Sequence, residues 1–189
     1  MSLLVWVLVI LGVVVLWVIF IFNTLIRAKN RTEEAWNDIK IQLKRRYELI
    51  PDLMKTVQAA ISLDEKLLTE ITKLRSQATA LDEEDASPGK RAEVEGKLGT
   101  MLGSLKIQVE AYPEIKSHGE ISQFMTELTD TQDKILASQR FYNSNVRDFN
   151  IKLEVFPNNL MAGVLGFKAY EFFEVAPEEE AKPEVELNV

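Results

Sequence analysis

The sequence predicts an all-α protein with one N-terminal transmembrane helix, followed by an elongated antiparallel bundle of three to four long helices. Three observations support this prediction. Residues 3–22 are apolar apart from Gly12. Beyond them, apolar residues recur at alternating spacings of three and four, the pattern of an amphipathic helix. The 189 residues include only eight glycines and six prolines, so few positions would interrupt a helix.

The apolar segment 3–22 has the length of a membrane anchor. As a helix, its 20 residues would span about 30 Å, the thickness of a bilayer's hydrocarbon core. A cleaved signal peptide would begin with basic residues, have a shorter apolar stretch and end at a small-residue site. The sequence begins Met1-Ser2 and shows no such site. We therefore expect residues 1–26 to form a short exported N-terminus and a retained anchor.

Basic residues follow the anchor closely. Arg27, Lys29 and Arg31 come within nine residues of Phe22, and four more follow by Arg46. Lysine and arginine flanking a span are preferentially kept on the cytoplasmic side. The sequence thus predicts a single-pass protein whose N-terminus faces out and whose residues 27–175 form a cytoplasmic bundle domain.

The first long apolar stripe runs from Trp36 to Leu81 in one heptad phase, with Arg46 and Asp64 as misfits. It predicts either one helix over 27–81 or two helices broken near Ser62. Ser62 and Glu65 have the spacing of a capping box, which favours a break. We expect Pro51 to kink the helix rather than end it.

A loop is expected over 82–90, where Ser87-Pro88 would start the next helix. The stripe from Val94 to Tyr112 predicts that helix. Its glycines offer room for close approach by another helix, with simple tolerance as the alternative; they are Gly96, Gly99 and Gly103. Pro113 would end this helix, and Ser117 and Glu120 have the spacing of a second capping box.

The last stripe runs from Ile121 to Phe156 and would stop at Pro157. With a break near Ser62, four helices would alternate in direction and bring Pro157 near the membrane; three helices would leave it far away. Asn158 and Asn159 are expected in a turn. The apolar hook that follows, through Phe173, should pack back on the bundle end.

Residues 176–189 contain five Glu and one Lys, so they carry −4 of the formal net charge of −7. They predict an acidic disordered tail, with a recognition element as the alternative.

The composition excludes several kinds of chemistry. Without Cys the chain has no disulfide, thiolate metal site or cysteine nucleophile. Its single His, His118, is expected in an exposed turn and makes a histidine zinc site untenable. A negative net charge argues against nucleic-acid binding, and no phosphate-binding loop or nucleophile elbow is present. We therefore expect no cofactor, no metal, no small-molecule substrate and no enzymatic activity.

Arg45, Arg46 and Tyr47 form the most distinctive polar cluster. One interpretation is a contact patch for a partner protein or anionic headgroups. A continuous helix would carry Arg45 roughly 35 Å beyond Phe22, too far for lipid of the same membrane. The other interpretation, which we favour, is that one arginine pairs with carboxylates of a neighbouring helix.

Asn143 and Asn150 are seven residues apart, so they share one helix face, and each follows an aromatic residue, Tyr142 or Phe149. Asparagine is unfavourable inside a helix. Two in register suggest buried polar layers that fix the register or cap a neighbouring backbone. Ligand binding is the alternative.

Two segments resemble signatures of the LemA family. Residues 42–53, QLKRRYELIPDL, resemble its QLxRRxxLIPxL motif. Residues 140–173 resemble its C-terminal signature of two aromatic-Asn pairs, Phe-Pro and Gly-Phe. Phe149 departs from the Tyr-Asn usual at the second pair and removes one hydroxyl. The resemblance implies an inner-membrane helical-bundle protein, and it implies no defined molecular activity.

These observations lead to two functional hypotheses. The leading one is a membrane-anchored interaction or scaffold protein that binds protein partners, with self-association into a homo-oligomer left open. The alternative, suggested by the resemblance alone, is a regulatory adaptor in membrane proteostasis or envelope stress. An enzyme with an unrecognised site is the remote third.

Overall fold

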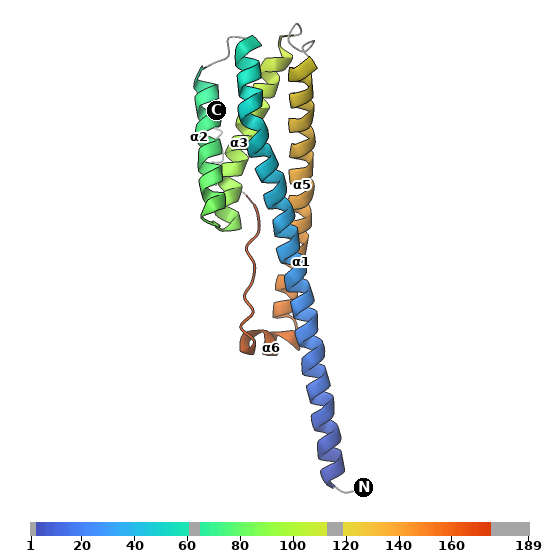
Figure 1. The fold of residues 1–189 in the computed structure, drawn as a ribbon. Coiled ribbons are helices and arrows are strands. Elements are labelled where there is room, and N and C mark those ends of the chain that lie inside the picture. The colour runs from blue at the N-terminus through green and yellow to red at the C-terminus, as the bar shows by residue number, and fades with distance from the viewer. Residues whose placement is uncertain (1–2, 61–64, 113–118, 175–189) are drawn as a thin grey trace, which may run out of the picture.

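The structure is a computed structural model that describes residues 3–60, 65–112 and 119–174. Within these ranges the protein forms five helices and no strand, which confirms the all-α prediction. Four of the helices make an elongated bundle, and the N-terminal part of the first projects from one end (Figure 1). The predicted acidic tail, His118 and the cap residues Ser62 and Ser117 lie outside the described residues.

Helix α1 (Leu3–Ala60) is one continuous helix of 58 residues. Its first part is apolar and exposed, and it is the one described helix long and apolar enough to cross a membrane. The helix passes through Pro51 without ending, as expected. Its predicted stripe is largely buried from Ile39 to Val57. The apolar segment and the bundle therefore share one unbroken helix.

Of the two alternatives that the sequence left open over 27–81, the structure has two helices. Helix α1 ends at Ala60 and α2 (Glu65–Glu83) begins five residues later. Residues 84–87 connect α2 to α3 (Pro88–Glu110), so the expected loop over 82–90 is shorter than predicted. Pro88 occupies the first turn of α3, whereas Ser87 at the N-cap makes no side-chain capping bond. Asp85 turns the connection with a left-handed φ of 48°.

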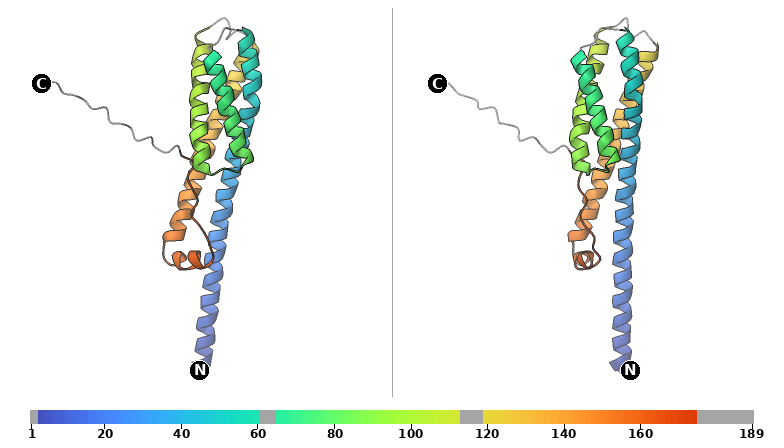
Figure 2. Two further views of the ribbon diagram at one scale, coloured as in Figure 1. Left: turned by 90° about the vertical axis from the view of Figure 1, so that its left-hand side faces the viewer. Right: turned by 60° about the vertical axis from the view of Figure 1, so that its left-hand side comes forward.

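Helix α5 (Gly119–Glu154) returns along the whole bundle. It packs against α1, and α2 packs against α3, so each of these four helices runs opposite to the one before it (Figure 2). Pro157 therefore lies at the end from which the apolar part of α1 projects, as the four-helix alternative predicts. Tyr112 does not continue the buried stripe of α3; its side chain is exposed.

A short helix, α6 (Asn158–Val164), follows Pro157 and crosses α1 at this end of the bundle. The expectation that Asn158 and Asn159 form a turn is therefore wrong. Ala162 is buried against Ile21 and Leu25 of α1, and this burial outweighs the turn preference of the asparagines.

The last described residues, 167–174, run in extended form back along the bundle, and we call them the strap. Phe173 of the strap is buried in the main core, where it packs on Trp36 of α1 with 5.6 Å between ring centroids. The apolar hook thus packs on the bundle in two ways: α6 packs near the apolar part of α1, and the strap lies along the helices.

Candidate functional site

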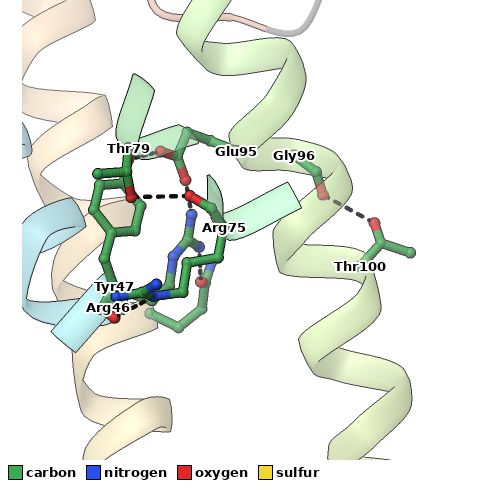
Figure 3. Close-up of polar contacts among 8 residues, drawn as sticks. Arg46, Tyr47, Arg75, Thr79, Glu95, Gly96 and Thr100 are labelled. Carbon is green, nitrogen blue, oxygen red and sulfur yellow. Dashed lines mark hydrogen bonds and ion pairs between the residues drawn. The ribbon is translucent and has the colours of Figure 1, made fainter. Parts of the chain in front are cut away.

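Arg46 lies in the apolar stripe of α1 and is 1% exposed. Its Nη2 forms an ion pair with the Glu95 carboxylate of α3 (Figure 3). Its Nη1 donates to Oε1 of Gln132 on α5, 2.9 Å away. A buried charge is tolerated where it is paired and hydrogen-bonded. The residue that interrupts the stripe in the sequence therefore connects three helices.

Tyr47 completes the surroundings of Glu95. Its hydroxyl donates to Oε1 of Glu95, so both carboxylate oxygens have partners from α1. Burial, followed by the charge of Glu95, raises the pKa of Tyr47 well above its ordinary value. Arg75 of α2 donates to the Tyr47 carbonyl oxygen at 2.7 Å and so brings a fourth helix to the cluster.

A second buried arginine, Arg91 of α3, lies beside Trp36. It forms an ion pair with Asp82 at the end of α2, and its guanidinium carbon is 5.3 Å from the centroid of the Trp36 ring, within cation–π range. Burial lowers its pKa from the ordinary value. Sequence reasoning missed Arg91 and Glu95, although a signal was present: they precede Leu98 by seven and three residues, and so share its buried face.

Asn143 and Asn150 bind the strap backbone. The amide of Asn150 accepts from the Tyr170 N–H at 2.9 Å and donates to the Tyr170 carbonyl at 3.0 Å. Asn143 makes the same two bonds to Phe173, at 2.9 and 3.1 Å. Seven residues of helix rise about 10.5 Å and three residues of extended chain about 10 Å, so the two spacings match.

Two tyrosine hydroxyls add to the attachment of the strap. Tyr142 of α5 donates to the Glu171 carbonyl oxygen at 2.8 Å, and burial raises its pKa to about 12. Tyr170 of the strap donates to Glu33 of α1 at 2.8 Å. The aromatic-Asn pair Tyr142-Asn143 therefore presents three polar groups to one short length of backbone.

A groove of about 950 Å³ opens between α3 and α5, beside the end of the strap. Arg46 and Glu95 contribute to its lining, and Asn143 lies at its strap end. On α3 its wall is built from small residues, including Gly96 and Gly99, which leave the space open. Of the three glycines considered for close helix approach, Gly96 and Gly99 thus border an open groove, whereas Gly103 is not part of its lining.

Two further arginines, Arg140 and Arg147, line the groove from α5. Among the described residues neither forms a hydrogen bond or an ion pair. The Nε of Arg46 also has no hydrogen-bond partner among the described residues. Glu174 of the strap lies at the same end and is the one exposed carboxylate in the lining. The groove thus offers guanidinium and amide donors, which suit carboxylate or phosphate oxygens.

The structure separates the candidate residues named from the sequence. Arg46 and Asn143 line the groove, whereas Tyr47, Tyr142 and Asn150 lie in the packing around it, and Arg45 is exposed outside it. Sequence reasoning missed Arg140, Arg147 and Gln132 as groove residues. They line the groove because α5 faces α3, and no local sequence pattern predicts which helices face each other. Within the described ranges, no three acidic or histidine side chains lie together so as to hold a metal.

Comparison with known proteins finds relatives that align with most of this chain. The LemA family model matches residues 35–187. Protein LemA of Metamycoplasma hominis is 29% identical over 154 aligned residues, which cover 82% of this chain and 69% of that protein. Magnetosome protein MamQ 2 of Paramagnetospirillum magneticum is 25% identical over 178 residues, covering 82% of this chain and 65% of the relative, just under two thirds. With a family match over most of its length, the chain belongs to the LemA family.

Proposed function

We propose that this chain is a membrane-anchored scaffold protein that binds an acidic segment of a partner protein in the α3–α5 groove. The observation that carries the proposal is the pair of arginines, Arg140 and Arg147, which line an open groove and have no partner among the described residues. Their spacing of seven residues puts both on one face of α5. The proposal makes the protein a binding protein rather than an enzyme.

The groove is built to keep its shape. Arg46 of α1 connects the two helices that form the groove, through its ion pair with Glu95 of α3 and its hydrogen bond to Gln132 of α5. The bonds of Asn143 hold the strap at one end. A preformed groove loses less conformational entropy on binding, which supports a role in recognition.

We place the groove on the cytoplasmic side of the inner membrane, with α1 as a single-pass anchor. The support is the run of basic residues directly after the apolar segment. Proximity labelling from the C-terminus in living cells tests this placement together with the partner. Labelling of exported proteins alone would contradict it.

Site-specific photocrosslinking tests the groove directly. A photoreactive residue at Ser144, which lines the groove, should form an adduct with a partner, and Ala137, exposed on α5 outside the lining, is the matched control. The Ser144 adduct should map to an acidic partner segment and be lost in Arg140→Glu/Arg147→Glu. Equal adducts at both positions would contradict the proposal. So would an adduct with this chain's own residues 176–189, or with a second copy of the chain.

A further inference from the structure

Helix α6 exposes large apolar side chains at the end of the bundle nearest the apolar part of α1. Phe156, just before it, is 78% exposed; Leu160 is 58% and Val164 is 80% exposed. We propose that this surface, which we call the α6 face, lies in the interface of the bilayer that α1 crosses. The inference rests on the proposed membrane anchoring and adds a second, interfacial contact with lipid.

The packing of α6 fixes its depth. Ala162 is buried against Ile21 and Leu25 of α1, and the Phe22 and Phe167 rings lie 6.4 Å apart. If residues 3–22 fill the hydrocarbon core, Leu25 lies about 4.5 Å beyond its edge. Helix α6 is therefore level with the boundary between acyl chains and headgroups.

The direction of α6 suits this position. In Figure 1 it runs crosswise to α1, so it would lie along the plane of a membrane that α1 crosses. Leu160 and Val164 are four residues apart and share a face, while Ala162, two residues from each, faces α1 on the other side. The exposed apolar side chains thus point away from the protein, into the surroundings of the anchor.

Lipid is the occupant that the surroundings of the α6 face support. Helix α6 packs on α1 at Ile21 and Leu25, directly after exposed apolar residues of α1 such as Ile19 and Phe20. Lys168, exposed just after Phe167, can reach headgroup phosphates from this level. A water-soluble partner would need to sit inside the headgroup layer to cover the same side chains.

The absence of cysteine from the chain permits a direct test with single-cysteine variants. The full chain carries a bimane label at Val164→Cys and is reconstituted in phosphatidylcholine vesicles with brominated acyl chains, which quench fluorescence on contact. Leu11→Cys, inside the apolar segment, reports the anchor. Ile107→Cys is the matched control, because Ile107 is an apolar residue that is 69% exposed near the C-terminal end of α3, and that end of α3 lies far from α6 (Figure 1).

The α6 face in lipid predicts strong quenching at Val164 and Leu11 and none at Ile107. Quenching at Leu11 with Val164 behaving like Ile107 would overturn the inference and leave the anchor intact. An absence of quenching at Leu11 as well as at Val164 would overturn both the inference about α6 and the proposed membrane anchor. If the label at Val164 becomes shielded from water only as the protein concentration rises, and brominated lipid does not quench it, the α6 face binds a second copy of the chain and the inference is wrong. A label at Leu160→Cys repeats the measurement if the first label perturbs packing.

Discussion

Arg46 of α1 and Glu95 of α3 form an ion pair in the middle of the bundle, with side chains that are 1% and 3% exposed. Gln132 and Tyr47 satisfy further atoms of the pair. Burying two charges costs desolvation free energy. Removing one partner destabilises the fold further, because the other charge is then buried without a counter-charge. The pair therefore holds α1 and α3 in one register.

Glu95→Gln should lower the free energy of unfolding by about 3–5 kcal/mol, because Arg46 would lose its counter-charge inside the bundle. Chemical denaturation of the full chain in detergent micelles, followed by circular dichroism, measures the change. Glu70→Gln is the matched control, since its partner Lys73 is exposed, and it should cost at most about 1 kcal/mol. Replacing both partners, as in Arg46→Met/Glu95→Leu, should recover much of the loss. Equal effects of Glu95→Gln and Glu70→Gln would refute the prediction.

Asn150→Ala should release the strap at Tyr170 without unfolding the bundle. It removes two hydrogen bonds, each contributing about 1 kcal/mol, and exposes the Tyr170 amide to exchange. Hydrogen exchange followed by mass spectrometry should show faster exchange over 167–174. Asn145→Ala is the control, because the hydrogen bond of Asn145 that the structure describes stays within α5, from its side-chain amide to the Phe141 carbonyl. Unchanged exchange in the strap would show that the asparagine does not hold it.

Alkaline pH should destabilise the bundle through its buried tyrosines. Burial raises the pKa of Tyr142 from 10.0 to about 12, so the folded state keeps its proton more tightly than the unfolded state does. Its contribution to stability is complete below pH 10 and declines as the pH rises toward 12. Denaturant unfolding at a series of pH values should show this decline, and Tyr142→Phe should make it smaller. An identical decline in Tyr142→Phe would contradict the assignment.

Gly99→Leu should fill the α3–α5 groove and leave the bundle folded. A Cβ at Gly99 meets only Arg46 Nη1, at 3.8 Å, which is ordinary contact, and leucine favours helix over glycine by about 0.5–1 kcal/mol. We expect an unchanged or raised melting temperature together with loss of the Ser144 photocrosslink. Gly103→Ala, with nothing within 4 Å, should keep the crosslink. A crosslink that survives Gly99→Leu would place the partner elsewhere.

The helices were predictable because their apolar stripes are local patterns. The continuation of α1 through Pro51 was predicted from the sequence, whereas the break between α1 and α2 was one of two alternatives, because the apolar stripe keeps one phase across it. The return of Pro157 toward the apolar part of α1 follows only if that break is present. Arg46 was visible as a misfit in its stripe, but its partners Glu95 and Gln132 were not, since pairing depends on which helix faces meet. The turn expected at Asn158 failed for the same reason: its neighbour Ala162 is buried against Leu25, more than 130 residues away.

Because α1 is unbroken, the proposed anchoring of its apolar segment in a membrane would couple the tilt of that segment to the position of the groove. Arg46 lies about 36 Å along this helix beyond Phe22, so a change of about 10° in the tilt of the apolar segment would displace the groove sideways by about 6 Å. Helix α1 is continuous between these two residues. Under the proposed anchoring, a bilayer whose thickness alters the tilt of the span would therefore also alter the position and angle of the groove relative to the membrane.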